Sequence, residues 1–412
     1  MILEAVRLSH APQRVVDVRV ERGRIASICD SVSRRSDLVL LPGLVDLHTH
    51  LREPGGEGAE DIASGTRAAV AGGYTDVFAM PNTEPAVDSV QHVLLQRELA
   101  RGASSRVHTI AAATMGRRGR ELVDVAALRA QGVHVFSDDG ACVDDPAVVE
   151  ALLRSLAVLG GVFAQHAQSA SLAERGVANA RVASSLGVEP WPVEAEEAVV
   201  ARDIDLAAAT GGRLHICHVS TAGTVALVRA AKARGVPVTA EVAPHHLLLT
   251  DSLLQAENGV FKVNPPLRAE ADVEALRLGL RDGTIDIVAT DHAPHSKAKK
   301  LAPLADAAFG FTGLETALSI VADVFEDADG RVDWSRVADV LAHRPAAIGG
   351  VASVAGRPLI VGEPATFALV RAGATYAVDG ADHMSASANT PFQGRTLRHR
   401  VESVWIEGVP AR

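Results

Sequence analysis

The sequence is short of cysteines, aromatic side chains and long apolar stretches, and each shortage excludes a class of protein. Three of its 412 residues are cysteines, Cys29, Cys142 and Cys217. Their odd number and unrelated spacings argue against a disulfide framework and favour a reducing cytoplasm. No apolar run approaches membrane-spanning length, and the N-terminus lacks the basic and apolar segments of a secretion signal. We therefore expect a soluble, cytoplasmic protein with no membrane partner.

Positive charge is also scarce. The formal net charge is −10, and the longest basic stretch is the short segment Lys297–Lys300. This balance argues against a nucleic-acid surface, but it is compatible with a locally positive pocket for an anionic substrate. The rest of the composition is that of an ordinary globular protein, with 48% hydrophobic and 22% charged residues. Because aromatic residues make up only 3%, Ala, Val and Leu must fill most of the core.

The central part of the chain alternates short Val/Ile/Ala-rich runs with amphipathic helical stretches, as buried parallel strands covered by helices do. Eight such runs can be counted: Leu44–His50, Tyr74–Asn82, Val107–Ala113, Val133–Asp139, Val162–His166, Arg213–Ser220, Val236–His246 and Ile285–His295. The predicted helices between them include Asp61–Ala71, Pro146–Leu159, Val193–Ala209, Thr221–Arg234 and Glu270–Asp282. Eight alternations predict an α/β fold of the (β/α)8 TIM-barrel type, with an open doubly wound sheet as the alternative.

Both ends of the chain are predicted to form strands instead. Before the barrel lie Ile2–Leu8, Val15–Glu21 and Arg24–Ile28, and after it lie Ala365–Val370, Tyr376–Val378 and Val401–Ile406. The simplest assembly pairs the two ends in one small β-sandwich domain. This predicts three segments: residues 1–43 and 347–412 for the small domain, and residues 44–346 for the barrel.

Histidines and aspartates fall at the ends of the predicted strands. His48 and His50 are one residue apart on the first strand, so both imidazoles lie on the same face. Four further residues end strands four, five, six and eight: Asp139, His166, His218 and Asp291. In a barrel these ends meet at the face where active sites are built. Imidazole and carboxylate ligands without thiolate suit zinc or a similar divalent ion, with cobalt and manganese as substitutes.

Each histidine taken alone is more often a hydrogen-bonded core or surface residue than a ligand. His215 has that ordinary interpretation, because it lies three residues before His218 and so points to the opposite side of its strand. The set of six is a stronger signal than any one member. If two ions are bound, Asp139 is the natural bridge, because a carboxylate offers two oxygens.

The segment from Pro42 to Gly55 carries a recognisable motif, His48-Thr-His50-Leu-Arg52-Glu-Pro-Gly55. An apolar strand ending in His-x-His is typical of the amidohydrolase superfamily, and the extension to Arg and Pro-Gly resembles that of dihydroorotases. Further matching stretches follow in the same order over essentially the whole chain: Met80-Pro-Asn82, Phe136-Ser-Asp-Asp139-Gly, His215-Ile-Cys-His218-Val-Ser, Lys262-Val-Asn264-Pro-Pro, Asp291-His-Ala-Pro-His295 and Phe309-Gly310.

The resemblance implies a role for each metal-ligand position. His48, His50 and Asp291 would hold one metal, His166 and His218 the other, and Asp139 would bridge them. Asp139 is preferred over Asp138 because its 27-residue distance to His166 matches the family spacing. Many amidohydrolases use a carboxylated lysine as the bridge, but the lysines here, at positions 232, 262, 297, 299 and 300, lie far from the fourth strand. The chain therefore resembles the dihydroorotase branch that uses an aspartate, rather than dihydropyrimidinases and most allantoinases.

The resemblance also implies a reaction, the reversible hydrolysis of (S)-dihydroorotate to N-carbamoyl-L-aspartate in pyrimidine (UMP) biosynthesis. A hydroxide held between two zinc ions would attack the ring amide, and Asp291 would act as the general base and acid; a single zinc ion is the other occupancy considered. Arg52, Asn82 and His295 would contact the substrate carboxylate. Asn264, Phe309 and Gly310 would contact the ring amide, and residues 296–308 are predicted to form a mobile loop over the site.

Two other functions remain open from the sequence. One is another cyclic amidohydrolase, such as an allantoinase-like enzyme. The other is an inactive dihydroorotase-like subunit that scaffolds aspartate carbamoyltransferase, although the six filled ligand positions favour a catalyst. For an active enzyme, the resemblance leaves open a homodimer and an association with that transferase.

Overall fold

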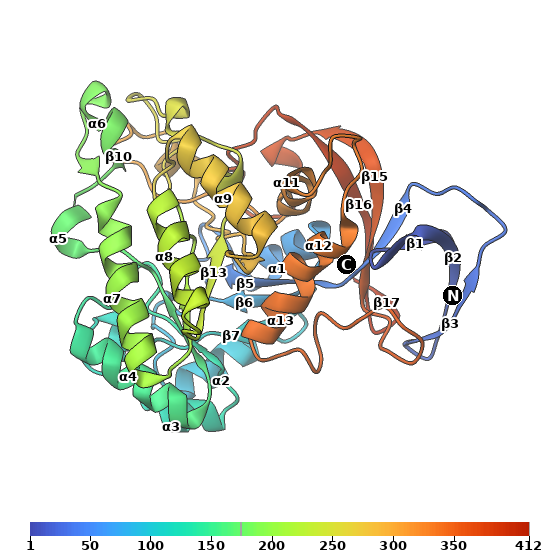
Figure 1. Cartoon of the computed structure of the whole chain (residues 1–412), viewed down its shortest axis with the longest axis horizontal. Coiled ribbons are helices and arrows are strands. Elements are labelled where there is room, and N and C mark those ends of the chain that lie inside the picture. Colours follow the sequence, from blue (N-terminus) through green and yellow to red (C-terminus); the bar gives the residue numbers. More distant parts are fainter. Residues whose placement is uncertain (174, 412) are drawn as a thin grey trace.

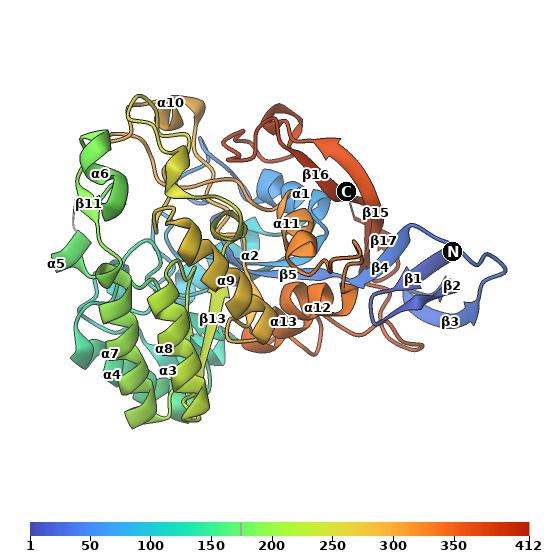
Figure 2. The same ribbon diagram turned by 45° about the horizontal axis from the view of Figure 1, so that its top comes forward.

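The computed structural model describes residues 1–173 and 175–411. Its helix-covered barrel lies beside a β-domain that contains both chain ends (Figure 1, Figure 2). In Figure 1 the blue N-terminal strands and the red C-terminal strands lie together on the right, and the rest of the chain forms the barrel. Within the described residues, no helix combines the length and apolar character needed to cross a membrane.

Eight parallel strands form the barrel: β5 (Leu44–Thr49), β6 (Tyr74–Ala79), β7 (Arg106–Thr109), β8 (Val135–Phe136), β9 (Val162–Gln165), β12 (Leu214–Ile216), β13 (Val238–Val242) and β14 (Ile287–Val288). They pair in two ladders, β5-β6-β7 and β14-β13-β12-β9-β8. Isolated parallel bridges join the ladders at Ala111–Phe136 and at Thr49–His292. The second bridge connects the first strand to the eighth, which confirms the closed barrel and excludes the open sheet.

The five helices predicted from periodicity are all present: α1 (Ile62–Ala71), α4 (Pro146–Leu159), α7 (Glu194–Thr210), α8 (Ala222–Ala233) and α9 (Glu270–Asp282). Side-chain caps explain several starts, since Asp61 accepts the Ser64 N–H and Thr221 accepts the Thr224 N–H. The other α-helices are α2 (Val90–Leu99), α3 (Val125–Ala130), α5 (Ala170–Ala173), α6 (Ala180–Leu186), α10 (Lys297–Lys300), α11 (Ala317–Val324), α12 (Trp334–Ala338) and α13 (Arg344–Ile348). A two-stranded ladder pairs β10 (Ala178–Asn179) with β11 (Pro190–Trp191).

Two of the barrel strands are much shorter than the sequence predicts. The runs Arg213–Ser220 and Ile285–His295 contain only β12 and β14, of three and two residues. The backbone explains the early ends, because φ is +29° at His218 and +47° at Asp291. A left-handed φ cannot continue a strand. The two candidate ligands therefore lie on irregular backbone just beyond the ladder.

The β-domain is a series of seven hydrogen-bonded strands with the order β17-β16-β15-β4-β1-β2-β3. Its members are β1 (Ile2–Leu8), β2 (Ala11–Glu21), β3 (Arg24–Asp30), β4 (Leu38–Pro42), β15 (Phe367–Ala377), β16 (Thr396–Ile406) and β17 (Val409–Pro410). Val18 and Ile25 from the N-terminal strands share one buried core with Phe367 from β15, as the two layers of a sandwich do. The pairing of both chain ends in one domain agrees with the prediction. We propose that the domain boundaries lie near residues 43 and 347.

Candidate metal centre and substrate pocket

Six imidazole and carboxylate side chains gather at the carboxyl end of the barrel strands. Each lies at or just after the end of a strand: His48 and His50 at β5, Asp139 after β8, His166 after β9, His218 after β12 and Asp291 after β14. All six are buried, with exposed fractions from 0% to 5%. The structure therefore brings together the residues that the sequence places far apart.

Asp139 lies at the middle of this cluster. Its Oδ1 is 3.4 Å from His48 Nε2, 3.2 Å from His166 Nδ1 and 3.5 Å from His218 Nε2. Its Oδ2 is 3.4 Å from His50 Nε2. The two oxygens thus lie within 3.5 Å of four imidazoles, so this carboxylate is placed to be shared by two ions.

Asp291 completes a second group of ligand atoms. Its Oδ1 is 3.1 Å from His50 Nε2 and 3.6 Å from His48 Nε2. Two sets of three side chains have ligand atoms within 4.8 Å of one another, and they are His48, His50 and Asp291, and Asp139, His166 and His218. A third set joins Cys217 to His48 and Asp139, but burial raises the pKa of this thiol and favours its neutral form.

The hydrogen bonds within the cluster leave a buried imidazole nitrogen available to bind a metal. His48 Nε2 is buried and has no hydrogen-bond partner among the described residues. The other nitrogen of the ring, Nδ1, lies 2.6 Å from Glu241 Oε1. A carboxylate on one imidazole nitrogen and a free, inward-facing second nitrogen is the arrangement of a metal-bound histidine. Because this unpaired nitrogen also lies near the carboxylates of Asp139 and Asp291, it is placed to serve as a ligand atom.

The two neighbouring aspartates that follow β8, Asp138 and Asp139, face different partners. Asp138 turns away from the cluster and accepts the N–H groups of Ala113 and Thr114 and the Thr114 hydroxyl. Burial alone would raise the pKa of Asp139, but His48, His166 and His218 outweigh burial and hold that pKa well below its usual range. Asp139 is therefore the anion that faces the imidazoles.

Backbone strain accumulates around the same cluster. Besides His218 and Asp291, Arg52 has a left-handed φ of +62°. Such conformations cost of order 1–3 kcal/mol each for residues other than glycine, and they concentrate where a side chain must be aimed. Here the left-handed backbone accompanies the side chains of Arg52, His218 and Asp291, which all line the same cavity.

The cluster opens into a cavity of about 220 Å³. The side chains expected to contact substrate line this cavity together with the candidate ligands, and they are Arg52, Asn82, Asn264, His295, Phe309 and Gly310. The guanidinium of Arg52 lies beside His295, with 3.5 Å between Nη2 and Nε2, and Arg52 Nε is buried without a partner among the described residues. The two glutamates nearest to Arg52 in the sequence, Glu53 and Glu57, accept backbone N–H groups and form no ion pair with Arg52.

The two asparagines contact histidines of the cluster. Asn82 Oδ1 lies 3.0 Å from His50 Nδ1. Asn264 Nδ2 lies 3.2 Å from His166 Nε2 and 3.0 Å from Gln168 Oε1. Each asparagine therefore contacts a candidate ligand histidine at the ring nitrogen that faces away from Asp139.

The segment predicted as a mobile loop, residues 296–308, includes the short helix α10. Lys300 is buried, and its ammonium donates to the carbonyls of Lys262 at 2.7 Å and Ala308 at 3.1 Å. Burial and the nearby Lys262 lower the pKa of Lys300 to about 7. These bonds connect the segment that carries Asn264 to the segment that carries Phe309.

Comparison with known proteins shows the family. A family model described as dihydro-orotase-like matches residues 37–224. A dihydroorotase of Streptomyces coelicolor is 52% identical over 374 residues, covering 90% of this chain and 87% of the relative. A dihydroorotase of Mycobacterium tuberculosis is 46% identical, covering 95% of this chain and 94% of the relative.

The chain belongs to the dihydroorotase family. Among solved structures, the L-hydantoinase (dihydropyrimidinase) of Arthrobacter aurescens aligns with a TM-score of 0.85 over 99% of this chain and 95% of that chain. Its sequence is only 22% identical, so this likeness shows the fold alone. It is the barrel with a β-sandwich domain that the sequence predicts.

Glu241 is a residue of this family member's site that the sequence analysis missed. It is the penultimate residue of β13 (Val238–Val242) and is 1% exposed, with one oxygen on His48 and the other 3.0 Å from His215 Nε2. His215 lies outside the ligand cluster, as expected, but it supports the carboxylate that orients His48. A glutamate within an apolar strand was the available signal, because a carboxylate is buried only with partners.

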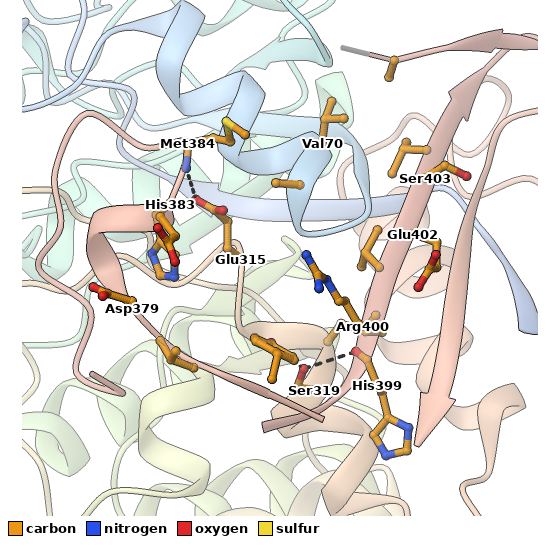
Figure 3. A pocket seen from close by; sticks show the side chains of 18 of the residues that line it. Val70, Glu315, Ser319, Asp379, His383, Met384, His399, Arg400, Glu402 and Ser403 are labelled. Carbon is orange, nitrogen blue, oxygen red and sulfur yellow. Dashed lines mark hydrogen bonds between the residues drawn. The ribbon is translucent and has the colours of Figure 1, made fainter. Parts of the chain in front are cut away.

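A larger cavity, of about 530 Å³, lies between β15, β16 and the segment around His383 (Figure 3). Glu315, Arg400 and Glu402 line it, and none of the residues predicted for catalysis or binding does. Cavity size therefore does not locate the site in this molecule. The convergence of ligand atoms does.

Proposed function

We propose that this enzyme interconverts (S)-dihydroorotate and N-carbamoyl-L-aspartate, a step of pyrimidine biosynthesis. Its class, a metal-dependent cyclic amide hydrolase, follows from family membership. The observation that carries the proposal is that one cavity is lined both by the candidate metal ligands and by Arg52, a buried arginine that forms no ion pair with a carboxylate among the described residues. Dihydroorotate needs both, because it has an amide to hydrolyse and a carboxylate to bind.

We propose zinc as the metal, with His48, His50 and Asp291 on one ion, His166 and His218 on the other, and Asp139 shared. The donor set supports this assignment, since imidazole and carboxylate without thiolate suit zinc. When bound, such ions lower the pKa of water and polarise a carbonyl oxygen. The unpaired Nε2 of His48 and the two sets of three ligand atoms support this assignment.

Asp291 is proposed to move the proton of the reaction. Burial alone would raise its pKa, but the hydrogen bond to His50 and the charges of His48, His50 and His218 lower it. Asp291 is thus an anion at neutral pH and can accept a proton from the attacking water. It would then deliver that proton to the departing amide nitrogen, and the roles reverse in cyclisation.

Arg52, Asn82 and His295 are proposed to bind the substrate carboxylate. A guanidinium can hold a carboxylate through two parallel hydrogen bonds. Burial lowers the pKa of His295 to about 3, and the positive charge of Arg52 adds to this effect. The neutral imidazole lies 2.6 Å from the Phe309 carbonyl, so it is held by one nitrogen. Asn264, Phe309 and Gly310 are left to contact the ring amide.

Replacing Arg52 with Lys is expected to raise KM for dihydroorotate by about ten- to a hundredfold, with a smaller change in kcat. A lysine keeps the charge but loses the paired hydrogen bonds, which are worth about 1.5–3 kcal/mol when charged groups are involved. Steady-state kinetics in both directions would measure the effect. Arg101→Lys, at an exposed ion pair with Glu98, is the control. A KM equal to that of the wild type would remove Arg52 from the site.

The function itself is tested with the isolated, zinc-loaded chain. Dihydroorotate should be hydrolysed and carbamoyl aspartate cyclised, while allantoin and hydantoin should be poor substrates. Chelation should abolish both reactions, and added zinc should restore them. Turnover by the chain alone would also show that no transferase subunit is needed. A metal-replete chain that preferred allantoin, or that turned over none of these compounds, would contradict the proposal.

We also propose that the protein is located in the cytoplasm. Cys29, Cys142 and Cys217 are all free thiols in the structure. A protein that keeps its thiols unpaired suits a reducing compartment.

A further inference from the structure

A short segment of the β-domain contacts residues that line the substrate pocket of the barrel. It comprises residues 384–390, between β15 and β16, and is called the C-terminal strap below. At its start, Glu315 accepts the Met384 N–H at 2.8 Å (Figure 3). Glu315 also accepts the Ser385 N–H at 3.4 Å. Glu60 accepts the Ala386 N–H at 2.9 Å and the Ser385 hydroxyl. The strap is thus attached to two carboxylates that belong to the barrel.

At the other end of the strap, Asn389 connects two segments that line the pocket. Its Oδ1 accepts the His295 N–H at 3.1 Å. Its Nδ2 donates to the Gly310 carbonyl at 3.2 Å and to the Ala293 carbonyl at 3.4 Å. Its own carbonyl accepts the Thr312 N–H at 3.3 Å. The Asn389 amide group therefore links the residues just after Asp291 to the residues just after the 296–308 segment.

The two connected segments fit together with little space. A Cβ at Gly310 would lie 2.8 Å from the Ala293 carbonyl oxygen and 3.1 Å from His295 Nε2, and φ of Gly310 is +133°. Small displacements of either segment would therefore move His295 against Gly310. A link that holds both segments at a set distance controls the shape of the pocket wall.

We propose that Asn389 is a positioning residue for substrate recognition, which holds His295 and Gly310 at the spacing that the carboxylate and ring amide of the substrate require. The inference rests on the proposed function, because it takes His295 and Gly310 as substrate contacts. It also gives the β-domain a role in the site: one of its residues shapes the pocket without touching a candidate metal ligand.

Asn389→Ala in the zinc-loaded enzyme is the first test. KM for dihydroorotate should rise about tenfold, while kcat should change less than about threefold and the zinc content should stay at the wild-type value. Asn389→Asp keeps the acceptor for the His295 N–H but places a carboxylate oxygen against the Gly310 and Ala293 carbonyls, so it should also raise KM. Gln393→Ala is the control, because Gln393 is an exposed amide in the same region whose bonds go to Gly380 and Asp379.

A double-mutant cycle separates positioning from a general loss of stability. If Asn389 acts in part through His295, then Asn389→Ala should raise KM by a clearly smaller factor in a His295→Ala background than in the wild type, with the remaining effect coming from Gly310. Equal effects in both backgrounds, or an Asn389→Ala enzyme with wild-type KM, would overturn the inference. A wild-type chain that is zinc-loaded but inactive on dihydroorotate would instead defeat the proposed function.

Discussion

Asp291→Asn is expected to lower kcat by about a thousandfold or more in both directions while the protein stays folded. General acid–base catalysis contributes about 10²–10⁴-fold, and an amide can neither accept nor return the proton. The change is nearly isosteric, and Asn can keep the contact with His50, 3.1 Å away. Stopped assays of both directions, with circular dichroism to follow folding, would measure the result.

The metal content of this variant must be measured beside its activity, because Asp291 is also a candidate ligand. An Asp291→Asn protein that retains its zinc and has lost turnover supports a role in proton transfer. One that has lost zinc as well would show that the ligand role dominates. A variant with zinc bound and kcat within tenfold of the wild type would contradict the assignment of Asp291 as general base and acid.

Asp139→Asn is expected to remove at least about one zinc ion per chain and to lower activity by a hundredfold or more. Outer contacts alone change metal affinity about 10–100-fold, so loss of a shared ligand should cost at least as much. Asp139 faces four imidazoles at 3.2–3.5 Å, and an amide supplies one oxygen and no charge. Metal analysis of the dialysed protein and zinc titration of the apo-protein would measure the loss.

The neighbouring residue offers a matched control. Asp138→Asn makes the same chemical change one position away, but Asp138 accepts hydrogen bonds from Ala113 and Thr114 and does not face the cluster. It should lower Tm, because hydrogen bonds to a buried charge weaken, and it should keep the full zinc content. The reverse pattern, zinc lost from Asp138→Asn and kept in Asp139→Asn, would show that the two roles were assigned to the wrong residues.

Much of the fold could be predicted because its signals are local. The alternation of apolar runs with capped helices predicts the barrel, and the helices α4 and α9 have the predicted bounds. Strand ends could not be placed as well, because β12 and β14 stop where the backbone of His218 and Asp291 turns left-handed. Such turns are stabilised by contacts around the residue and leave no composition signal.

What the sequence alone determined is which residues could meet. A period of two puts His48 and His50 on one face, and parallel strands bring their carboxyl ends to one edge, so the set of candidate ligands follows from local pattern and topology. The tertiary structure decided which atoms are paired. Glu241 reaches His48 across 193 positions, and Asn389 reaches His295 across 94. Hydrogen bonds between distant residues depend on the positions of side-chain atoms at the ångström scale, and sequence periodicity carries no information at that scale.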